Sequence, residues 1–161
     1  MKTIEIVGAN YFGSWTEQRT ACRAVVIRDG QILLSYETVT DQWMVPGGGL
    51  EPGEEDVACC VREVAEETGH IIEPSPCVLE LDEYYEDCRY VDRYFSGTVT
   101  GRCERHLTER ERTVGMEPRW LLIEEALAIF SRHADYAATD EMRRGMYLRE
   151  FTALSNILPT S

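Results

Sequence analysis

The segment 48–69, which reads GGLEPGEEDVACCVREVAEETG, constrains the fold of this sequence more than any other part of it. It begins within a run of three glycines and ends in a cluster of acids at Glu63, Glu66 and Glu67. On a helix with 3.6 residues per turn, Glu63 and Glu67 lie one turn apart on one face, with Glu66 beside them. The opposite side of that helix carries a stripe of valines, namely Val57, Val61 and Val64. The pattern predicts a helix with a carboxylate face and a buried face.

Acidic helix faces are usually solvated, and that interpretation explains the acids at 54–56, because negative charge is favourable near a helix N-terminus. It explains Glu63, Glu66 and Glu67 poorly, because they lie in the last turns, where the helix dipole disfavours anions. Like charges one turn apart also repel each other. A hard divalent cation would remove that cost, because Mg²⁺ takes oxygen ligands. The cluster therefore indicates a metal site, with a solvated acidic face as the alternative.

The spacing of these residues resembles the Nudix box, here at 48–70, and the lead-in at 43–54 is similar to that family as well. The matching positions are Gly48, Glu54, Arg62, Glu63, Glu66, Glu67 and Gly69. His70 departs from the pattern, because the family usually has a large aliphatic residue there. That position serves packing in the family, so we expect no effect on the chemistry.

The resemblance implies an α/β fold, an α/β/α sandwich with a mixed β-sheet, and a single Nudix hydrolase domain over residues 1–161. Within it, residues 1–18 are expected to form an N-terminal extension or an edge strand, and residues 139–157 a C-terminal helix. The implied activity is a pyrophosphohydrolase that uses Mg²⁺ or Mn²⁺ and cleaves a diphosphate linkage in a nucleoside diphosphate derivative by water attack. The alternative is a catalytically silent module of the same fold that binds ligands or regulates.

Site residues are carried over by position. The catalytic candidates are Arg62, Glu63, Glu66 and Glu67, and which glutamate acts as the general base is left open. The metal-binding candidates are Gly47, Glu63, Glu66, Glu67 and Glu117. Glu117 is selected from a set of later acids that also includes Glu109 and Glu111. Arg62 is expected to pair with Glu66 or Glu54 and to hold the carboxylates in register.

Substrate contacts are less constrained, and the candidates are Trp43, Arg23 and Tyr85. Other tyrosines that could stack on a base are Tyr84, Tyr90 and Tyr94. Alternation along the strand at 90–99 makes half of its aromatic residues core or cross-strand partners. No particular substrate follows from these residues.

Composition limits the remaining possibilities. A chain of 161 residues with 43% hydrophobic residues suits one globular domain. The net charge of -13 argues against a nucleic-acid surface, because phosphate backbones need basic patches. No apolar run is long enough to span a membrane, and no signal-peptide pattern is present. The six cysteines include an adjacent pair and no CxxC motif, so we expect reduced thiols in a cytoplasmic protein. Partners are a small nucleoside diphosphate derivative and, by family habit, a second copy in a homodimer.

The order of elements predicts an α/β protein, because strands alternate with helices. Asp29-Gly30 predicts a hairpin turn, Gly69 a helix C-cap, and 101–115 a polar loop. The predicted strands are 21–27, 31–36, 42–45, 71–72, 77–86, 90–99 and 119–123. The predicted helices, besides that of the box, are 124–131 and an amphipathic one at 139–154.

Overall fold

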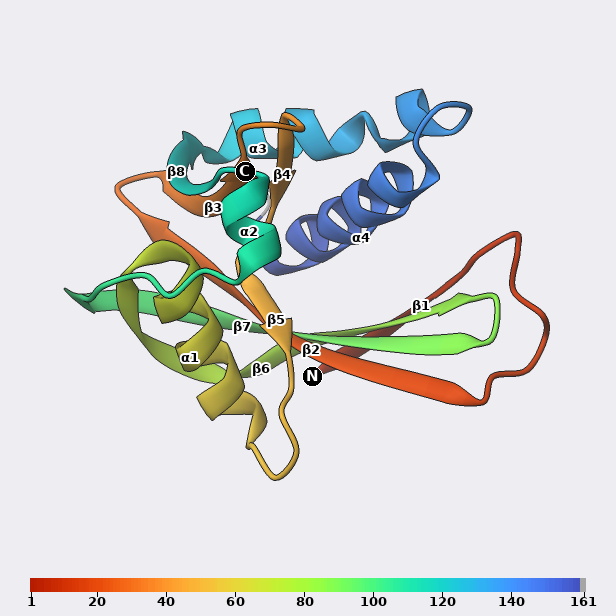
Figure 1. The fold of residues 1–161 in the computed structure, drawn as a ribbon, viewed down its shortest axis with the longest axis horizontal. Coiled ribbons are helices and arrows are strands. Elements are labelled where there is room, and N and C mark those ends of the chain that lie inside the picture. The colour runs from red at the N-terminus through yellow and green to blue at the C-terminus, as the bar shows by residue number, and fades with distance from the viewer. Residues whose placement is uncertain (160–161) are drawn as a thin grey trace.

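The computed structural model describes residues 1–159, and it shows a mixed β-sheet between two helical layers (Figure 1). This is the α/β/α arrangement that the sequence predicts. The strands are β1 (Lys2–Val7), β2 (Glu17–Arg28), β3 (Gln31–Glu37), β4 (Gln42–Met44), β5 (Gly47–Gly49), β6 (His70–Tyr85), β7 (Cys88–Arg102) and β8 (Met116–Leu122). The helices are α1 (Asp56–Thr68), α2 (Glu109–Thr113), α3 (Ile123–Ser131), the 3-10 helix η1 (His133–Tyr136) and α4 (Glu141–Ile157).

The sheet runs in the order β1-β6-β7-β2-β3-β4, with β5 on β2 and β8 on β3. Strands β1 and β6 are parallel, as are β2 and β7, while the remaining pairs are antiparallel. Strand β2 is central, because it bonds β7 along most of its length and also β3 and β5. The glycine triplet therefore lies in the sheet, as β5, directly beside β2.

Two hydrophobic cores lie on opposite faces of this sheet, and β2 contributes to both. Cys22, Ala24 and Val26 face α1, whereas Val25 faces the layer of α3 and α4. This alternation follows from the two-residue period of a strand. The core under α1 also includes Cys59, Cys60, Val64, Ile72 and Phe95. The core under α3 and α4 also includes Ile32, Leu34, Leu79, Leu81, Tyr94, Phe130, Tyr147 and Leu154.

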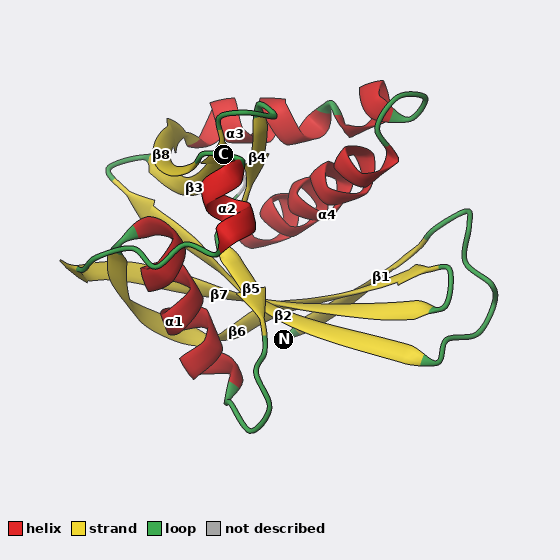
Figure 2. Cartoon of the chain, viewed as in Figure 1, coloured by secondary structure: helices red, strands yellow, loops and turns green. Residues whose placement is uncertain are grey.

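Beyond the helices, β1, β2, β6 and β7 continue as an extended ribbon that projects from the body (Figure 2). Residues 1–18 thus contain an edge strand, β1, which was one of the two expected arrangements. The hairpin between β6 and β7 turns at Glu86, whose φ is 51°. In the ribbon, Tyr85 and Tyr90 line a cavity together with residues of α4.

The predicted turn and helix end are present in the structure, but the predicted loop is partly regular structure. Asp29 and Gly30 have φ of 53° and 76° in the β2–β3 turn, and Gly69 has φ of 72° at the end of α1, as predicted. The predicted loop at 101–115 is wrong in part, because β7 extends to Arg102 and α2 forms within it. Thr108 and Glu111 close a capping box that nucleates this short helix. The segments 71–72 and 77–86 are one strand, β6, interrupted by bulges around its prolines.

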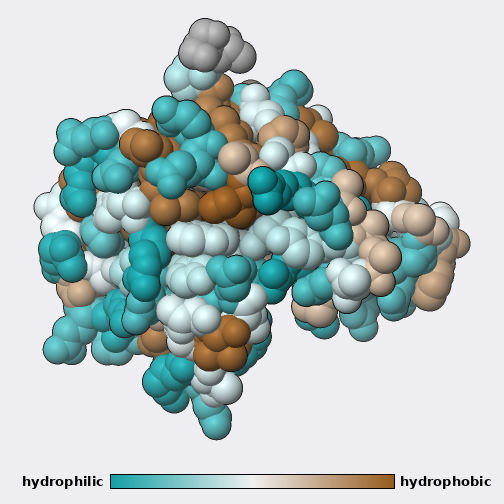
Figure 3. Space-filling model, turned by 90° about the horizontal axis from the view of Figure 1, so that it is seen from above, coloured by the Kyte–Doolittle hydropathy of each residue, from teal (hydrophilic) through white to brown (hydrophobic). Residues whose placement is uncertain are grey.

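The α-helices and 3-10 helix formed by residues 1–159 include none that combines the length and the apolarity needed to cross a membrane. All six cysteines are free thiols, as predicted. Seen from above, the surface is mostly hydrophilic and its hydrophobic residues form separate small groups (Figure 3). Homodimer formation stays a prediction.

Candidate active site

Helix α1 carries the box and is held at both ends. Asp56 in its first turn pairs with Arg93 of β7 at 2.7 Å, and Gly69 closes the last turn by donating its N–H to the Ala65 carbonyl. The predicted valine stripe is only partly correct, because Val57 is 42% exposed while Val64 is fully buried. Cys59 and Cys60 complete the buried face instead. Small thiols fit where α1 lies close to the glycine strand β5.

Arg62 ties the acids of the box together. Its guanidinium forks onto Glu54, with Nε to Oε2 at 2.7 Å and Nη2 to Oε1 at 2.9 Å. Its Nη1 donates to Glu63 at 3.0 Å and to Glu66 at 3.2 Å. Both predicted partners of Arg62, Glu54 and Glu66, are therefore confirmed. These charge-assisted bonds lower the pKa of Glu54 to about 2, chiefly through the hydrogen bond from Arg62.

Glu67 lies on the buried side of the acid cluster and is 2% exposed. Its carboxylate accepts a hydrogen bond from the Gly47 N–H at 2.8 Å and one from the Ser35 hydroxyl at 3.3 Å. Burial raises its pKa well above the ordinary range, and the nearby charge of Glu111 adds to that effect. Glu67 thus joins the last turns of α1 to the glycine strand. No basic side chain of residues 1–159 forms an ion pair with it.

Glu63 is held against the backbone of Gly48. A Cβ atom at Gly48 would lie 2.5 Å from the Glu63 carboxyl carbon, so a larger residue there would displace the Glu63 carboxylate. A Cβ at Gly47 would lie 2.3 Å from the Cys22 carbonyl oxygen. Burial raises the pKa of Glu63, partly offset by its hydrogen bond with Arg62. The glycines therefore allow the carboxylates and the backbone of β5 to approach closely.

The donor set suits a hard divalent cation, because every candidate ligand atom is an oxygen. Arg62 contacts one oxygen each of Glu63 and Glu66, which leaves the second oxygen of each carboxylate for another partner. Within residues 1–159, no three acidic, histidine or cysteine side chains already converge as a ligand group. The physical reason is that Arg62 draws Glu63 and Glu66 while the Gly47 amide draws Glu67. The metal site stays a prediction, and the oxygen atoms of these residues are suitable ligands for it.

The three later acids differ in their surroundings. Glu111 on α2 is close enough for its charge to raise the pKa of both Glu63 and Glu67. Glu117 on β8 pairs with Arg119. Glu109 opens α2 and is exposed. Of the three, Glu111 is the one whose charge acts on the box, and its carboxylate also accepts a hydrogen bond from the Thr108 N–H at 2.9 Å. Glu117 as a metal ligand stays a prediction.

Helix α4 supports the segment that leads into the glycine strand. Glu150 is fully buried and accepts hydrogen bonds from the Val45 N–H at 2.5 Å and the Tyr94 hydroxyl at 2.6 Å. Tyr147, one turn earlier, accepts a hydrogen bond from the Trp43 N–H at 3.1 Å. Sequence reasoning missed Glu150, because a buried acid in a predicted amphipathic helix gives no local signal of its partner.

A second buried charge network lies beside this support. Arg23 of β2 donates to Asp92 of β7 at 2.9 Å and to the Val45 carbonyl at 3.4 Å. Asp92 lies against Glu83 of β6, and Arg149 of α4 donates to Glu150 at 3.1 Å. Asp92 and Glu83 were also missed in the sequence. The available signal was period-two alternation, which places Asp92 on the same inward face as Tyr94.

The three predicted substrate contacts do not meet at one point. Trp43 stacks on Tyr36 with ring centroids 4.2 Å apart and lines a hollow beside α3 and η1. Tyr85 lines a different cavity under α4. Arg23 lines neither of them and is bonded to Asp92 and to the Val45 carbonyl oxygen. The structure therefore separates Trp43 from Tyr85 and places Arg23 in neither cavity.

This combination of a mixed sheet, a glycine strand and a glutamate helix defines a recognisable class. A family model described as "NUDIX domain" matches residues 17–142. The chain belongs to the NUDIX domain family. His70, the one departure in the box, is buried and packs edge-on against Trp120 with ring centroids 5.6 Å apart. It fills the packing position, as the resemblance suggested.

Among curated proteins, the chain is 34% identical over 105 residues to diphosphoinositol polyphosphate phosphohydrolase 3-alpha of Mus musculus. It is 32% identical over 105 residues to the 3-alpha protein of Homo sapiens. Each match covers 65% of this chain and 62% of the relative. The chain thus spans less than two thirds of the length of these relatives.

Two solved structures share the fold over most of the chain. The NUDIX hydrolase from Nitrosomonas europaea matches with a TM-score of 0.60 and 24% identity, covering 90% of this chain and 98% of that one. The E. coli ORF135 protein matches with a TM-score of 0.56 and 22% identity, covering 91% and 96%. At these identities the likeness establishes the fold and nothing more.

Proposed function

We propose that this chain is a divalent-cation-dependent pyrophosphohydrolase that cleaves a diphosphate linkage in a nucleoside diphosphate derivative by water attack. The observation that carries the proposal is the placement of Glu63, Glu66 and Glu67 around Arg62 and the glycine strand. Mg²⁺ or Mn²⁺ is the proposed cofactor, with Glu63, Glu66, Glu67 and the Gly47 carbonyl as ligands. Membership of the NUDIX domain family supports the reaction class.

Each residue of the box has a proposed role that follows from its position. When bound, the cation would neutralise charge on the phosphate oxygens and lower the pKa of a water molecule. Arg62 holds Glu63 and Glu66 in register, and its bidentate contact with Glu54 fixes its own orientation. The Gly47 amide positions Glu67, and one of the three glutamates would accept the proton of the attacking water. Cleavage of a diphosphate depends mainly on such positioning and electrostatics.

A second candidate substrate is a diphosphoinositol polyphosphate, because the curated relatives carry that name. It would require basic side chains for several additional phosphates. Two of the arginines near the glycine strand are already committed, Arg23 to Asp92 and Arg149 to Glu150. The nucleoside diphosphate derivative is therefore the proposal, and the inositol compound belongs in the same assay.

The test is a hydrolysis screen with Mg²⁺ over nucleotide sugars, dinucleoside polyphosphates, modified nucleoside triphosphates and a diphosphoinositol polyphosphate. We expect turnover of a nucleoside diphosphate derivative and a loss of at least about 100-fold in Glu66→Gln and Glu67→Gln. Glu55→Gln is the matched control, because Glu55 is exposed at the start of the same helix and caps no amide.

Three results would contradict the proposal. Turnover that survives both glutamine variants would exclude the box as the catalytic site. Hydrolysis of the inositol compound alone would replace the substrate. Binding of nucleotides without any turnover would favour the catalytically silent module.

A further inference from the structure

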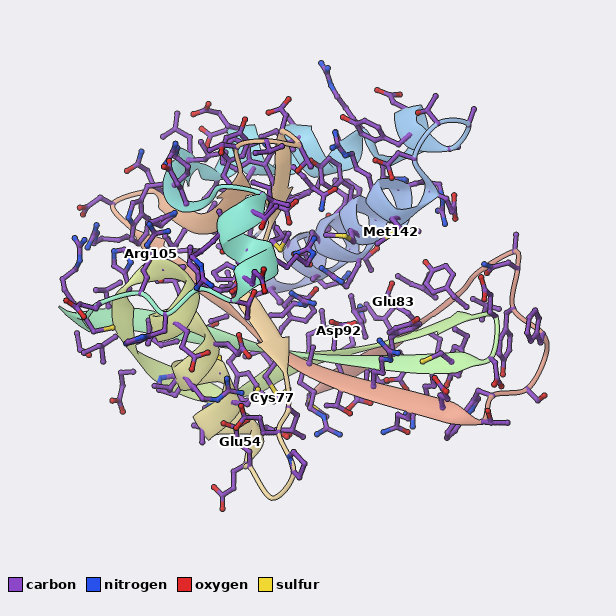
Figure 4. The ribbon with its side chains drawn as sticks, viewed as in Figure 1. Glu54, Cys77, Glu83, Asp92, Arg105 and Met142 are labelled. Atoms are coloured by element: carbon purple, nitrogen blue, oxygen red, sulfur yellow. The ribbon has the colours of Figure 1, made fainter. Side chains whose placement is uncertain are left out.

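A hollow of about 540 Å³ lies on the segment that joins β7 to α2, beside the C-terminal end of α1, and the proposed catalysis does not use it. Its lining consists of Glu104, Arg105, His106, Leu107 and Arg112. Figure 4 shows Arg105 at the end of α1, where this segment crosses the helix. We call this site the arginine hollow.

The backbone of the segment is fixed to the helix that carries the box. The Cys103 N–H donates to the Gly69 carbonyl at 3.0 Å. The His106 N–H donates to the Glu66 carbonyl at 2.8 Å. A Cβ atom at Gly69 would lie 3.3 Å from the Arg105 Cγ, so the stem of Arg105 packs on the end of α1. Because Glu66 is a proposed metal ligand, the hollow borders the site of the proposed reaction.

Arg105 and Arg112 differ from most arginines of this acidic chain, because no carboxylate of residues 1–159 forms an ion pair with them. Ion pairs with acids hold most of the other arginines, namely Arg23, Arg62, Arg89, Arg93, Arg110, Arg119, Arg143, Arg144 and Arg149. Arg105 donates instead to the Met116 carbonyl at 2.8 Å, and Arg112 donates to the Leu107 carbonyl at 2.6 Å. In a chain with a net charge of -13, two guanidinium groups without an acid in one hollow are an exception.

The charge and the shape of these two side chains suit a phosphate group. The lining carries two guanidinium groups against one carboxylate, that of Glu104. Both arginines are exposed, so an anion can reach them. Each guanidinium has further N–H groups besides the one bonded to a carbonyl, in a planar fork that matches phosphate oxygens. The carbonyl bonds also hold both side chains in place before an anion binds.

The negative end of the α1 dipole lies at the same place and would by itself disfavour an anion. It contributes about half an elementary charge, whereas each guanidinium contributes a full one. The sum stays positive with Glu104 included. The dipole also supplies the alternative role for the arginines, which is to offset the carbonyl groups at the helix end.

We propose that Arg105 and Arg112 bind a phosphate group of the substrate that is not part of the diphosphate being cleaved. The inference rests on the proposed function, because it places the scissile diphosphate at the box and adds a phosphate at its border. The substrate class is then a nucleoside diphosphate derivative with a further phosphate, either as an ester on a ribose or in a longer phosphate chain. A compound without that group lacks this contact and is turned over less efficiently.

The first measurement is binding without hydrolysis. Inorganic phosphate is titrated into the full chain without divalent cation, and the amide resonances are followed by NMR. We expect residues 104–112 to shift, and we expect an R105Q/R112Q double variant to bind at least roughly tenfold more weakly, because it loses two charge-assisted contacts. Arg132→Gln is the matched control, because Arg132 is also exposed and no acid of residues 1–159 forms an ion pair with it. Melting curves show whether each variant folds.

The second measurement is hydrolysis with Mg²⁺ of paired compounds that differ in their additional phosphate groups. ADP-ribose is compared with ADP-ribose 2′-phosphate, and diadenosine diphosphate with diadenosine tetraphosphate. We expect kcat/KM to favour the member of one pair that carries more phosphate by roughly tenfold, and this ratio to fall toward one in the double variant. The pair that responds shows whether the phosphate is on the ribose or in the chain.

The inference is overturned if phosphate does not bind, if it shifts residues outside 104–112 only, or if binding persists in the double variant. Absence of binding would leave the arginines as partners of the helix end. A kcat/KM ratio that is the same in the double variant and the unmodified chain, with phosphate still bound in the hollow, would assign the hollow to free phosphate and also overturn the inference.

The two measurements separate this inference from the proposed function. Hydrolysis of a nucleoside diphosphate derivative without phosphate binding in the hollow would overturn the inference alone. Phosphate binding in the hollow without hydrolysis of any compound would overturn the catalytic proposal and leave the arginines as a phosphate site.

Discussion

Gly48 and Gly49 are neighbours in the glycine strand, but an added methyl group meets different surroundings at the two positions. At Gly48 it would lie 2.5 Å from the carboxyl group of Glu63, whereas at Gly49 nothing lies within 4 Å. Gly48→Ala should therefore displace Glu63 and reduce kcat/KM on the order of 100-fold, the loss that a misplacement of about 1 Å can cause. Gly49→Ala, the control, should stay close to the unmodified chain. Equal kinetic effects in the two variants would contradict this account of Gly48.

Arg62 offers a second test at the residue scale. Lysine keeps the charge but lacks the fork that contacts Glu54, Glu63 and Glu66 together. We expect Arg62→Lys to weaken the apparent Mg²⁺ affinity about 10-fold to 100-fold, measured as the Mg²⁺ concentration for half-maximal activity. Arg93→Lys is the matched control, because Arg93 of β7 also bridges two acids, Asp56 and Glu80, but contacts the first turn of α1. An unchanged Mg²⁺ requirement in Arg62→Lys would show that the fork is dispensable.

Single residues of the box were the most predictable part of the site. Arg62 and its partners lie within one helix and its approach, so spacing alone placed them together. The burial of Glu67 was not predictable in the same way, because it depends on Ser35 and Gly47 from two other strands. Glu83 and Asp92 are joined only by the pairing of β6 with β7, and a linear sequence does not show which strand faces carry charge.

At the scale of elements, α4 supports the segment that leads into the glycine strand. Glu150→Ala would remove the acceptor of the Val45 amide and the Tyr94 hydroxyl and would leave Arg149 unpaired in the interior. We expect it to lower the free energy of unfolding by about 3–5 kcal/mol, measured by urea denaturation. Tyr147→Phe removes one bond to Trp43 and should cost about 1 kcal/mol. Ser155→Ala, exposed on the same helix, should cost almost nothing, and a loss there similar to that of Glu150→Ala would argue against a specific support.

Helix α4 also shows why elements were only partly predictable. Its range was close to the predicted one, but its buried face includes Arg149 and Glu150, so it is not amphipathic in the simple sense. The Glu150 carboxylate accepts hydrogen bonds from Tyr94 and Val45, which lie 56 and 105 positions away. By contrast, the β2–β3 hairpin and the end of α1 depend on Asp29-Gly30 and Gly69, whose backbone preferences are local.

For the whole molecule, binding of a cation to the folded state should increase stability. The acids of the box repel one another, and only the folded chain assembles them, so ligand linkage applies. We expect millimolar Mg²⁺ to raise Tm by about 5 °C in the unmodified chain and by much less in Glu66→Gln. Calorimetry with and without chelator measures both. The same shift in the two proteins would place the cation elsewhere.

The pH dependence of stability gives another test at this scale. Burial, together with the neighbouring Asp92, raises the pKa of Glu83 to about 9, although Arg149 and Arg23 oppose the shift. Folded chains therefore keep a proton that unfolded chains lose above the ordinary pKa of 4.5. The stabilising contribution is complete below 4.5 and is lost as pH rises toward 9. We expect the free energy of unfolding, measured by urea denaturation, to decline between pH 5 and 8. The slope should be shallower in Glu83→Leu, by an amount that corresponds to at most one bound proton. Parallel curves would contradict the assignment.

The bond between Glu150 and Val45 has a consequence for how the chain is made. The two residues are 105 positions apart, and Val45 leaves the ribosome first. At a synthesis rate of about 5–20 residues per second, the glycine strand waits on the order of ten seconds for its support. During that interval the nascent chain already contains the glutamates of the box, but the Val45 amide has no hydrogen-bond partner. The segment that leads into the glycine strand therefore acquires its hydrogen-bond partner only after α4 has been synthesised and has docked.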